Sequence, residues 1–156
     1  MSNENLETTT LTARGSSVRR KIADVAVDFV QACDTGNGWE ACEDFCTENA
    51  SFSAQCEELA NISSVSTYCD WVRDLLTALP DAKLELKSVA FDEARNTISI
   101  YSVLSGSHLG EGGPVPPTGQ SFKADYVYVI EFLGDRISHI TKVYNSAWTL
   151  RELGWT

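Results

Sequence analysis

The residues best suited to chemistry lie in two segments near the C-terminus. Both segments alternate as strands do, so side chains two positions apart share one face. Tyr126 and Tyr128 share a face in the first segment, and Lys142 and Tyr144 share one in the second. An inward-facing Lys142 must be paired, neutral or hydrated, because an unpaired ammonium is costly to bury. A lysine with a depressed pKa can act as a base or form a Schiff base, and a charged one can anchor an anionic ligand.

The turn between the two segments, Gly134-Asp135, decides which of these faces meet. A two-residue loop would set Tyr128 opposite Thr141, whereas a three-residue loop with a bulge would pair Tyr128 with Lys142. The spacing of the residues is compatible with both registers. The sequence therefore leaves open whether Lys142 faces an enclosed space or the solvent.

Each of these side chains also has a purely structural interpretation. A solvent-facing Lys142 would pair with an acid such as Asp125 or Glu131, and such pairs occur in ordinary structural networks. Alternating tyrosines more often belong to a core than to a catalytic site. His108, next to a glycine-rich loop, is expected to make local hydrogen bonds, with acid/base chemistry as the alternative. His139 is expected on the outer face of the sheet.

The elements that position these residues change type about halfway along the chain. Apolar residues recur at helical spacing before Pro80 and alternate after it. A short strand is predicted over residues 50–54, and helices are predicted to start at Ser16 or Ser17, at Trp39 and at Ser63 or Ser64. A short helix ends the chain, after an antiparallel meander of strands over residues 83–91, 97–109, 120–132 and 136–145. This segregation predicts an α+β fold with helices on one face of a curved sheet.

Length and composition exclude several classes of protein. The 156 residues are 43% hydrophobic, enough for one domain, predicted over residues 16–156 after a disordered tail of residues 1–15. A net charge of −10 argues against nucleic-acid binding. No apolar run approaches the roughly 18 residues of a membrane span. The N-terminus lacks the apolar core of a signal peptide, so we expect no membrane contact and a cytoplasmic location. The five cysteines are odd in number and form no CxxC pair, which predicts neither disulfides nor a metal site.

Short motifs in the last third of the chain follow one another in an order typical of one protein family. They are Gly106–Gly110 (G-x-H-x-G), Pro116–Gly119 (P-P-T-G), Gly134–Ile137 (close to D-G-K-I) and Thr149–Gly154 (ending in L-x-x-L-G). With the predicted order of helices and strands, these motifs make the chain resemble the SnoaL-like polyketide cyclases of the nuclear transport factor 2-like superfamily. The match is strong over residues 104–155, while the helices agree only in pattern.

The resemblance implies a cone-shaped sheet wrapped over three helices and enclosing an apolar pocket for a small, carbonyl-bearing molecule. It also implies a homodimer through the outer face of the sheet. The family's cyclases use no cofactor, and a carboxylate on the last strand and a histidine on the preceding strand serve an intramolecular aldol reaction. These two positions fall on Lys142 and Tyr128, and a histidine that usually precedes the carboxylate falls on Ile140. The resemblance favours the bulged register of the hairpin.

We therefore predict Lys142 as a base or iminium former and Tyr128 as a hydrogen-bond donor to an oxyanion. Ligand contacts are predicted for Tyr126, Tyr144, Ile140, His108, Phe29 and Trp71. The chain would then be a cofactor-independent isomerase or cyclase acting on a carbonyl-bearing hydrophobic substrate. The alternatives are a module that binds an acidic or carbonyl ligand without turnover and a structural protein whose cavity is packed core.

Overall fold

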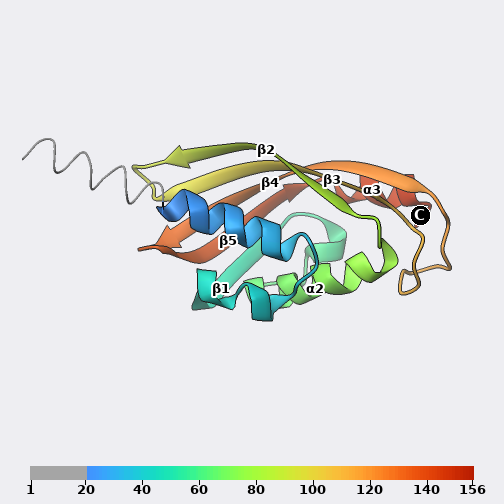
Figure 1. Ribbon diagram of the computed structural model, residues 1–156, viewed down its shortest axis with the longest axis horizontal. Helices are drawn as coiled ribbons and strands as arrows, with labels where there is room; N and C mark the ends of the chain where they lie inside the picture. The colour runs from blue at the N-terminus through green and yellow to red at the C-terminus, as the bar shows by residue number, and fades with distance from the viewer. Residues whose placement is uncertain (1–20) are drawn as a thin grey trace, which may run out of the picture.

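A computed structural model describes residues 21–156 of the chain. The predicted tail, residues 1–15, and the predicted start of the first helix at Ser16 or Ser17 lie outside these residues. The described chain forms an α+β fold in which one curved sheet packs against helices (Figure 1). The predicted fold class is therefore confirmed.

The N-terminal helix and α2 cover the inner face of the sheet. The N-terminal helix continues to residue 33, α2 spans Val65–Ala78 and α3 spans Ser146–Leu153. α2 begins where predicted, because the hydroxyl of Ser64 accepts a hydrogen bond of 3.1 Å from the backbone N–H of Thr67. The helix buries one stripe against the sheet, which includes Val65, Tyr68, Cys69 and Val72.

The segment between the N-terminal helix and the first strand differs from the prediction. Instead of one helix from Trp39, it forms two 3₁₀ turns, η1 over Trp39–Ala41 and η2 over Glu43–Phe45. Cys46 already belongs to the first strand. A stretch this short gains too few hydrogen bonds to offset the cost of nucleating an α-helix.

The sheet contains five strands, in the order β1-β5-β4-β3-β2. Their bounds are β1 Cys46–Ala54, β2 Lys83–Asp92, β3 Thr97–Ser107, β4 Ser121–Leu133 and β5 Arg136–Tyr144. β2 to β5 form the predicted antiparallel meander. The strand predicted over residues 50–54 is longer than expected and joins the sheet at its edge, parallel to β5.

The hairpin between β4 and β5 combines features of the two predicted alternatives. Its loop has only the two residues Gly134-Asp135, yet Tyr128 pairs with Lys142 as in the bulged register. The register shifts because Ser138 is an extra residue in β5 with no pairing partner in β4. This bulge brings Lys142 onto the inner face of the sheet beside Tyr128.

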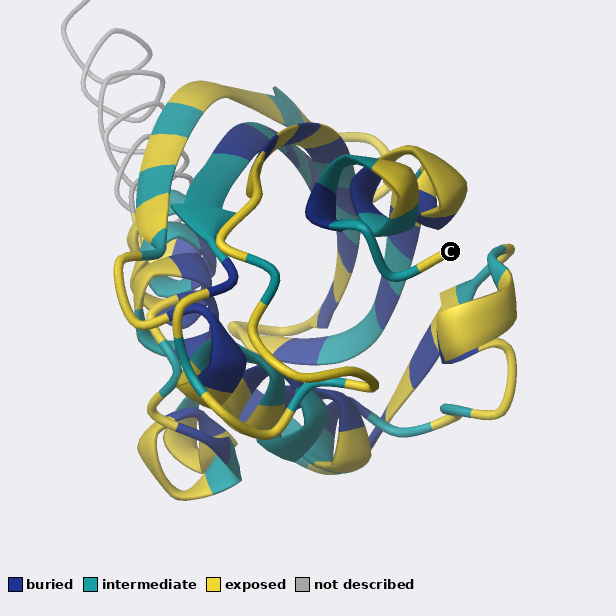
Figure 2. Ribbon diagram, turned by 90° about the vertical axis from the view of Figure 1, so that its right-hand side faces the viewer, coloured by how far each residue is buried: buried dark blue, intermediate teal, exposed yellow. Residues whose placement is uncertain are grey.

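Two groups of buried side chains fill the space under the sheet. The larger group lies between the N-terminal helix, α2 and the strands, and it includes Phe29, Tyr68, Tyr128 and Ile140. The smaller group lies where α3 packs against β4, and it consists of Ala78, Leu79, Phe122, Ala124 and Leu153. In Figure 2, buried stretches of the strands alternate with exposed ones around the curve of the sheet, with α3 at its open end.

Candidate functional site

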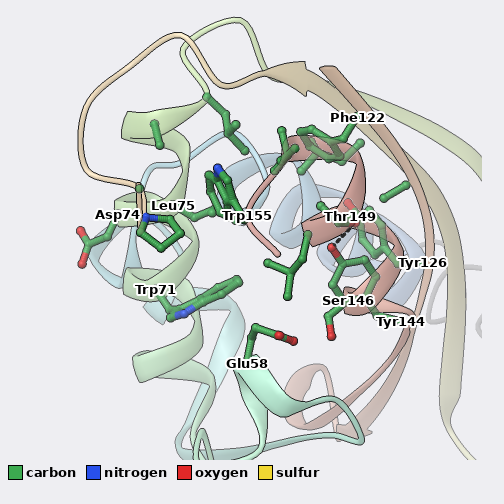
Figure 3. A pocket seen from close by; sticks show the side chains of 18 of the residues that line it. Glu58, Trp71, Asp74, Leu75, Phe122, Tyr126, Tyr144, Ser146, Thr149 and Trp155 are labelled. Carbon is green, nitrogen blue, oxygen red and sulfur yellow. Dashed lines mark hydrogen bonds between the residues drawn. The ribbon is translucent and has the colours of Figure 1, made fainter. Parts of the chain in front are cut away.

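A cavity of about 610 Å³ lies between α2, the inner faces of β4 and β5, α3 and the glycine-rich loop over residues 110–119. Figure 3 shows side chains from these elements arranged around it. Most of its wall is apolar and includes Leu75, Leu79, Phe122, Leu153 and Trp155. The polar groups are fewer and include Lys142, Tyr126, Tyr144, Glu58 and Asp74. A concave, mostly apolar space with a few polar groups is typical of a small-molecule site.

Lys142 reaches this cavity from β5 and is only 9% exposed. Its Nζ atom donates a hydrogen bond of 2.9 Å to the hydroxyl of Tyr68. The same atom lies 4.3 to 5.8 Å from the ring centroids of Tyr144, Tyr126, Tyr68 and Tyr128. Because aromatic faces attract cations, this tyrosine cage favours the charged ammonium. An ammonium has three donors, and the bond to Tyr68 uses one, so Lys142 can also donate to a ligand in the cavity.

A chain of hydroxyl groups connects Lys142 to a buried carboxyl group, that of Asp34. The hydroxyls of Tyr68 and Tyr128 lie 2.5 Å apart, and Tyr128 donates a hydrogen bond of 2.7 Å to Oδ1 of Asp34. Tyr126 donates to Oδ2 of the same carboxyl. Asp34 is only 4% exposed. These five residues, Lys142, Tyr68, Tyr128, Tyr126 and Asp34, are called the tyrosine network below. They come from four elements: the end of the N-terminal helix, α2, β4 and β5.

Burial has the largest influence on the pKa values in the network. It raises the pKa of Asp34, and the positive charge of Lys142 and the tyrosine hydroxyls oppose this in part. Burial lowers the pKa of Lys142, and the negative charge of Asp34 opposes it. The pKa of Tyr68 and that of Tyr128 are raised well above the ordinary value, mainly by burial, so both phenols stay protonated near neutral pH. The lysine and the carboxyl are therefore the two groups able to exchange a proton.

Comparison with known protein families shows which family this chain belongs to. A family model described as SnoaL-like polyketide cyclase matches residues 24–153. The chain belongs to this family. The predicted resemblance is thereby confirmed, and membership of the SnoaL-like family indicates a small-molecule protein of the cyclase or isomerase type.

Individual relatives agree with this assignment. The SnoaL-like domain is 30% identical over 84 residues to aklanonic acid methyl ester cyclase AcmA of Streptomyces galilaeus. That match spans 54% of this chain and only 56% of the relative. The structure is similar to that of AclR from Streptomyces galilaeus, with a TM-score of 0.71, 20% identity, and coverage of 88% of this chain and 83% of that one. It is also similar to a protein of ketosteroid isomerase-like fold from Catenulispora acidiphila, with a TM-score of 0.63, 11% identity, and coverage of 83% and 92%. At these identities the structural similarities show the fold alone.

The SnoaL-like fold distributes the predicted site residues between the cavity wall and the core. Those in the cavity wall are Lys142, Tyr126, Tyr144 and Trp71. Three others are completely buried in the main core and are not part of the wall, namely Tyr128, Ile140 and Phe29. Tyr128 still contacts the site, because its hydroxyl belongs to the tyrosine network. Phe29 and Ile140 lie behind the wall, where they support it by packing.

His108 lies beneath the glycine-rich loop at the other end of the cavity. Its Nδ1 atom accepts hydrogen bonds from Nε1 of Trp155, at 2.9 Å, and from the backbone N–H of Thr118, at 3.2 Å. Two donors at Nδ1 place the ring hydrogen on Nε2. Nε2 is buried and has no hydrogen-bond partner within residues 21–156. A Cβ atom added to Gly113, which lines the cavity, would lie 2.8 Å from Nε2. The local hydrogen bonds expected of His108 are therefore present, but His108 itself is not part of the cavity wall, so its predicted ligand contact stays a prediction.

Asp34 and Tyr68 were not among the residues predicted for the site. Asp34 directly follows the predicted helical stripe and precedes the glycine that ends the helix, so it reads as part of a turn. One signal could have identified it: Asp34 lies one helical turn after Val30, which is completely buried. An acid that continues the core-facing stripe of a helix requires a buried partner. Tyr68 belongs to the apolar stripe of α2, and its spacing alone indicates core packing.

Other kinds of site find no support in the described part of the chain. Within residues 21–156, no group of His, Cys, Asp and Glu side chains is arranged to hold a metal ion. The five cysteines are free thiols. No helix in the described region is long and apolar enough to cross a membrane. His139 lies away from the cavity, where its Nδ1 atom is 2.7 Å from the hydroxyl of Ser51 in β1.

Proposed function

We propose that this SnoaL-like protein is a cofactor-independent isomerase or cyclase that acts on a carbonyl-bearing hydrophobic small molecule. The observation that carries the proposal is the position of Lys142, whose amino group reaches an otherwise mostly apolar cavity of about 610 Å³. An amino group in such a place would meet the polar end of a substrate whose apolar body fills the rest of the cavity. The family assignment supports the reaction class by analogy.

Lys142 would act in one of two ways. As an amine it would take a proton from the carbon next to a carbonyl, or add to the carbonyl and lose water to form an iminium ion. As an ammonium it would stabilise the oxyanion of an enolate, since it is a charged donor in the cavity wall. Tyr128 was predicted for this donor role, but its hydroxyl proton is directed to Asp34. We therefore propose that Tyr128 acts on the site indirectly, through Tyr68.

A binding module without turnover is the second candidate function. It is favoured by the tyrosine hydroxyl groups of the cavity wall, which already donate to partners inside the protein. Tyr126 donates to Asp34, and Tyr144 donates to Thr149 at 2.6 Å. In that case Lys142 would anchor an acidic or carbonyl ligand, and no covalent step would follow.

Reductive trapping tests the proposed function. The protein is incubated with cyclohexanone and borohydride, and peptide mass spectrometry locates the adducts. We expect the adduct to form preferentially at Lys142. Ala124 lines the cavity, so Ala124→Leu should fill part of it and reduce the yield at Lys142 roughly tenfold, equivalent to about 1.4 kcal/mol of lost binding free energy. Val127→Leu is the matched control, because Val127 lies on the opposite face of the same strand.

The outcomes separate the candidate functions. No adduct at Lys142 would exclude the iminium route. If 2-naphthoate then still quenched the fluorescence of Trp71 and Trp155 saturably, the protein would be a binding module, since both tryptophans line the cavity. If neither trapping nor quenching were observed, both functions would be contradicted. The cavity would then be a packing defect of the core.

We also propose that the protein is a cytoplasmic homodimer that associates through the outer face of the sheet. Support comes from apolar residues on that face: Val127 and Val143 are paired across β4 and β5, and Val143 is 58% exposed. Exposed apolar residues grouped on one sheet face favour association with a second copy. Sedimentation equilibrium of the full chain measures the association directly, and a monomer at all concentrations would contradict it.

A further inference from the structure

The hydrogen bonds between Lys142 and Asp34 run in a single direction. Nζ of Lys142 donates to Tyr68, at 2.9 Å, and Tyr128 donates to the carboxylate of Asp34, at 2.7 Å. The proton of Tyr128 is thus committed to Asp34, so in the 2.5 Å contact between the two phenols Tyr68 must be the donor. Each group in the chain therefore donates to the next, from the ammonium to the carboxylate.

We propose that Asp34 stores the proton of Lys142, which reaches it through Tyr68 and Tyr128, so that the amine forms inside the protein without losing a proton to solvent. Asp34 is then a positioning residue that sets the state of Lys142 without touching the substrate. The proposal rests on the proposed function, because it explains how a caged lysine becomes the base or nucleophile.

The transfer conserves atoms and charge. Lys142 gives one proton to the oxygen of Tyr68, Tyr68 gives its hydroxyl proton to Tyr128, and Tyr128 gives its own to Oδ1 of Asp34. An ammonium and a carboxylate become an amine and a carboxylic acid, and both tyrosines remain neutral phenols. All the hydrogen bonds persist with their directions reversed, so no buried polar group loses its partner.

The surroundings act on the two forms of the pair in opposite directions. The tyrosine cage favours the ammonium, and the hydroxyl of Tyr126 favours the carboxylate. Burial acts in the opposite direction, since it penalises both charges, raising the pKa of Asp34 and lowering the pKa of Lys142. A substrate that fills the cavity and displaces water would favour the uncharged pair further. The other titratable groups that act on the pair are Cys33, Cys56, Tyr126 and Tyr144.

Proton storage predicts an unusual pH dependence for the reactivity of Lys142. While the pair holds a single proton, the fraction of amine depends only on how that proton is divided between Lys142 and Asp34, and not on pH. The rate of reductive methylation at Lys142 should therefore show a plateau across about pH 6 to about pH 8, between the ordinary pKa values of carboxyl and amino groups. At higher pH the rate should rise again, when the pair loses its last proton.

The measurement uses formaldehyde and cyanoborohydride, the smallest carbonyl reagent that can enter the cavity, with peptide mass spectrometry to quantify Lys142. Nα-acetyl-lysine in the same solution corrects for the reagent, because the amine fraction of an ordinary lysine rises tenfold per pH unit below its pKa. A rate at Lys142 that followed this standard throughout, without a plateau, would overturn the proposal.

Two variants sharpen the result. Asp34→Asn removes the store, so the rate should rise in a single step to its maximal value, and at lower pH than in the wild type, because the charge of Asp34 no longer raises the pKa of Lys142. Tyr126→Phe removes a hydrogen bond that stabilises the carboxylate, so the proton resides on Asp34 in a larger fraction of the molecules. The fraction of amine at Lys142, and with it the plateau rate, should therefore increase roughly tenfold. A two-step profile in Asp34→Asn, with an intermediate plateau and a second rise at higher pH, would also contradict the proposal.

The wild-type profile separates this inference from the proposed function. Ketone trapping at Lys142 without a plateau would leave the function standing and exclude Asp34 as the store. A plateau without ketone trapping would support proton storage in a protein that lacks iminium chemistry.

Discussion

The two ends of the cavity differ in how their buried polar groups are hydrogen-bonded. At the Lys142 end, the polar groups of the tyrosine network are joined to one another by hydrogen bonds. At the loop end, the wall is apolar around Phe122, Leu153 and Trp155, and His108 keeps one nitrogen without a partner in the described chain. The first end has groups that can exchange a proton, whereas the second mainly defines the shape of the space.

The elements behind each end explain this difference. The tyrosine network is carried by the N-terminal helix, α2 and the two paired strands β4 and β5, and regular elements hold side chains more precisely than loops. The loop end depends on a glycine- and proline-rich segment anchored at its base, where the backbone N–H of Gly119 donates to the carbonyl of His108 at 3.0 Å. The proposed proton exchange would thus take place at the end of the cavity that is built from helices and strands.

The largest effect is expected from breaking the network at the lysine. Lys142→Met removes the ammonium and leaves Asp34 without its compensating charge. We expect a loss of about 3 kcal/mol in the free energy of unfolding at neutral pH, measured with urea. Without Lys142 the pKa of Asp34 rises further, so part of the loss should be recovered as the pH is lowered and the carboxyl becomes protonated. A variant as stable as the wild type would show that the pair is not coupled.

A smaller effect is expected at the loop end. His108→Leu removes the acceptor of Trp155 Nε1–H and of the Thr118 N–H, which we expect to cost about 2 kcal/mol of unfolding free energy. His108→Asn is the matched control, because its side-chain oxygen can accept in place of Nδ1 and should restore part of the stability. Neither variant should change the pH profile of methylation at Lys142. A changed profile would show that the two ends of the cavity are not independent.

Much of the fold could be predicted from the sequence because its signals are local. The Ser64 cap, the stripe of α2 and the alternation of the last strands each occupy a short stretch of chain. The parallel pairing of β1 with β5 could not be predicted, because the alternation of apolar and polar residues along a strand does not indicate which other strand it pairs with. The spacing of residues in the hairpin left two registers open, and only the family resemblance favoured the bulged one, which pairs Tyr128 with Lys142.

The candidate site was harder to predict because it joins residues far apart in the sequence. Alternation places Ile140 and Lys142 on one strand face, but only the packing above them leaves the first completely buried and the second in the cavity wall. The contact of Asp34 with Tyr128 spans 94 residues, and that of Lys142 with Tyr68 spans 74. No pattern within a single element records such contacts.

The account depends most on the claim that Lys142 and Asp34 act as one unit through the two tyrosines between them. A double-mutant cycle with Lys142→Met, Asp34→Asn and the double variant tests this claim directly, with urea unfolding at neutral pH as the measurement. Each single variant leaves one buried charge unpaired, whereas the double variant leaves none. We predict that the double variant loses less than the sum of the single losses, with a coupling free energy of about 1.5 kcal/mol or more. Losses that add to within about 0.5 kcal/mol would contradict the claim.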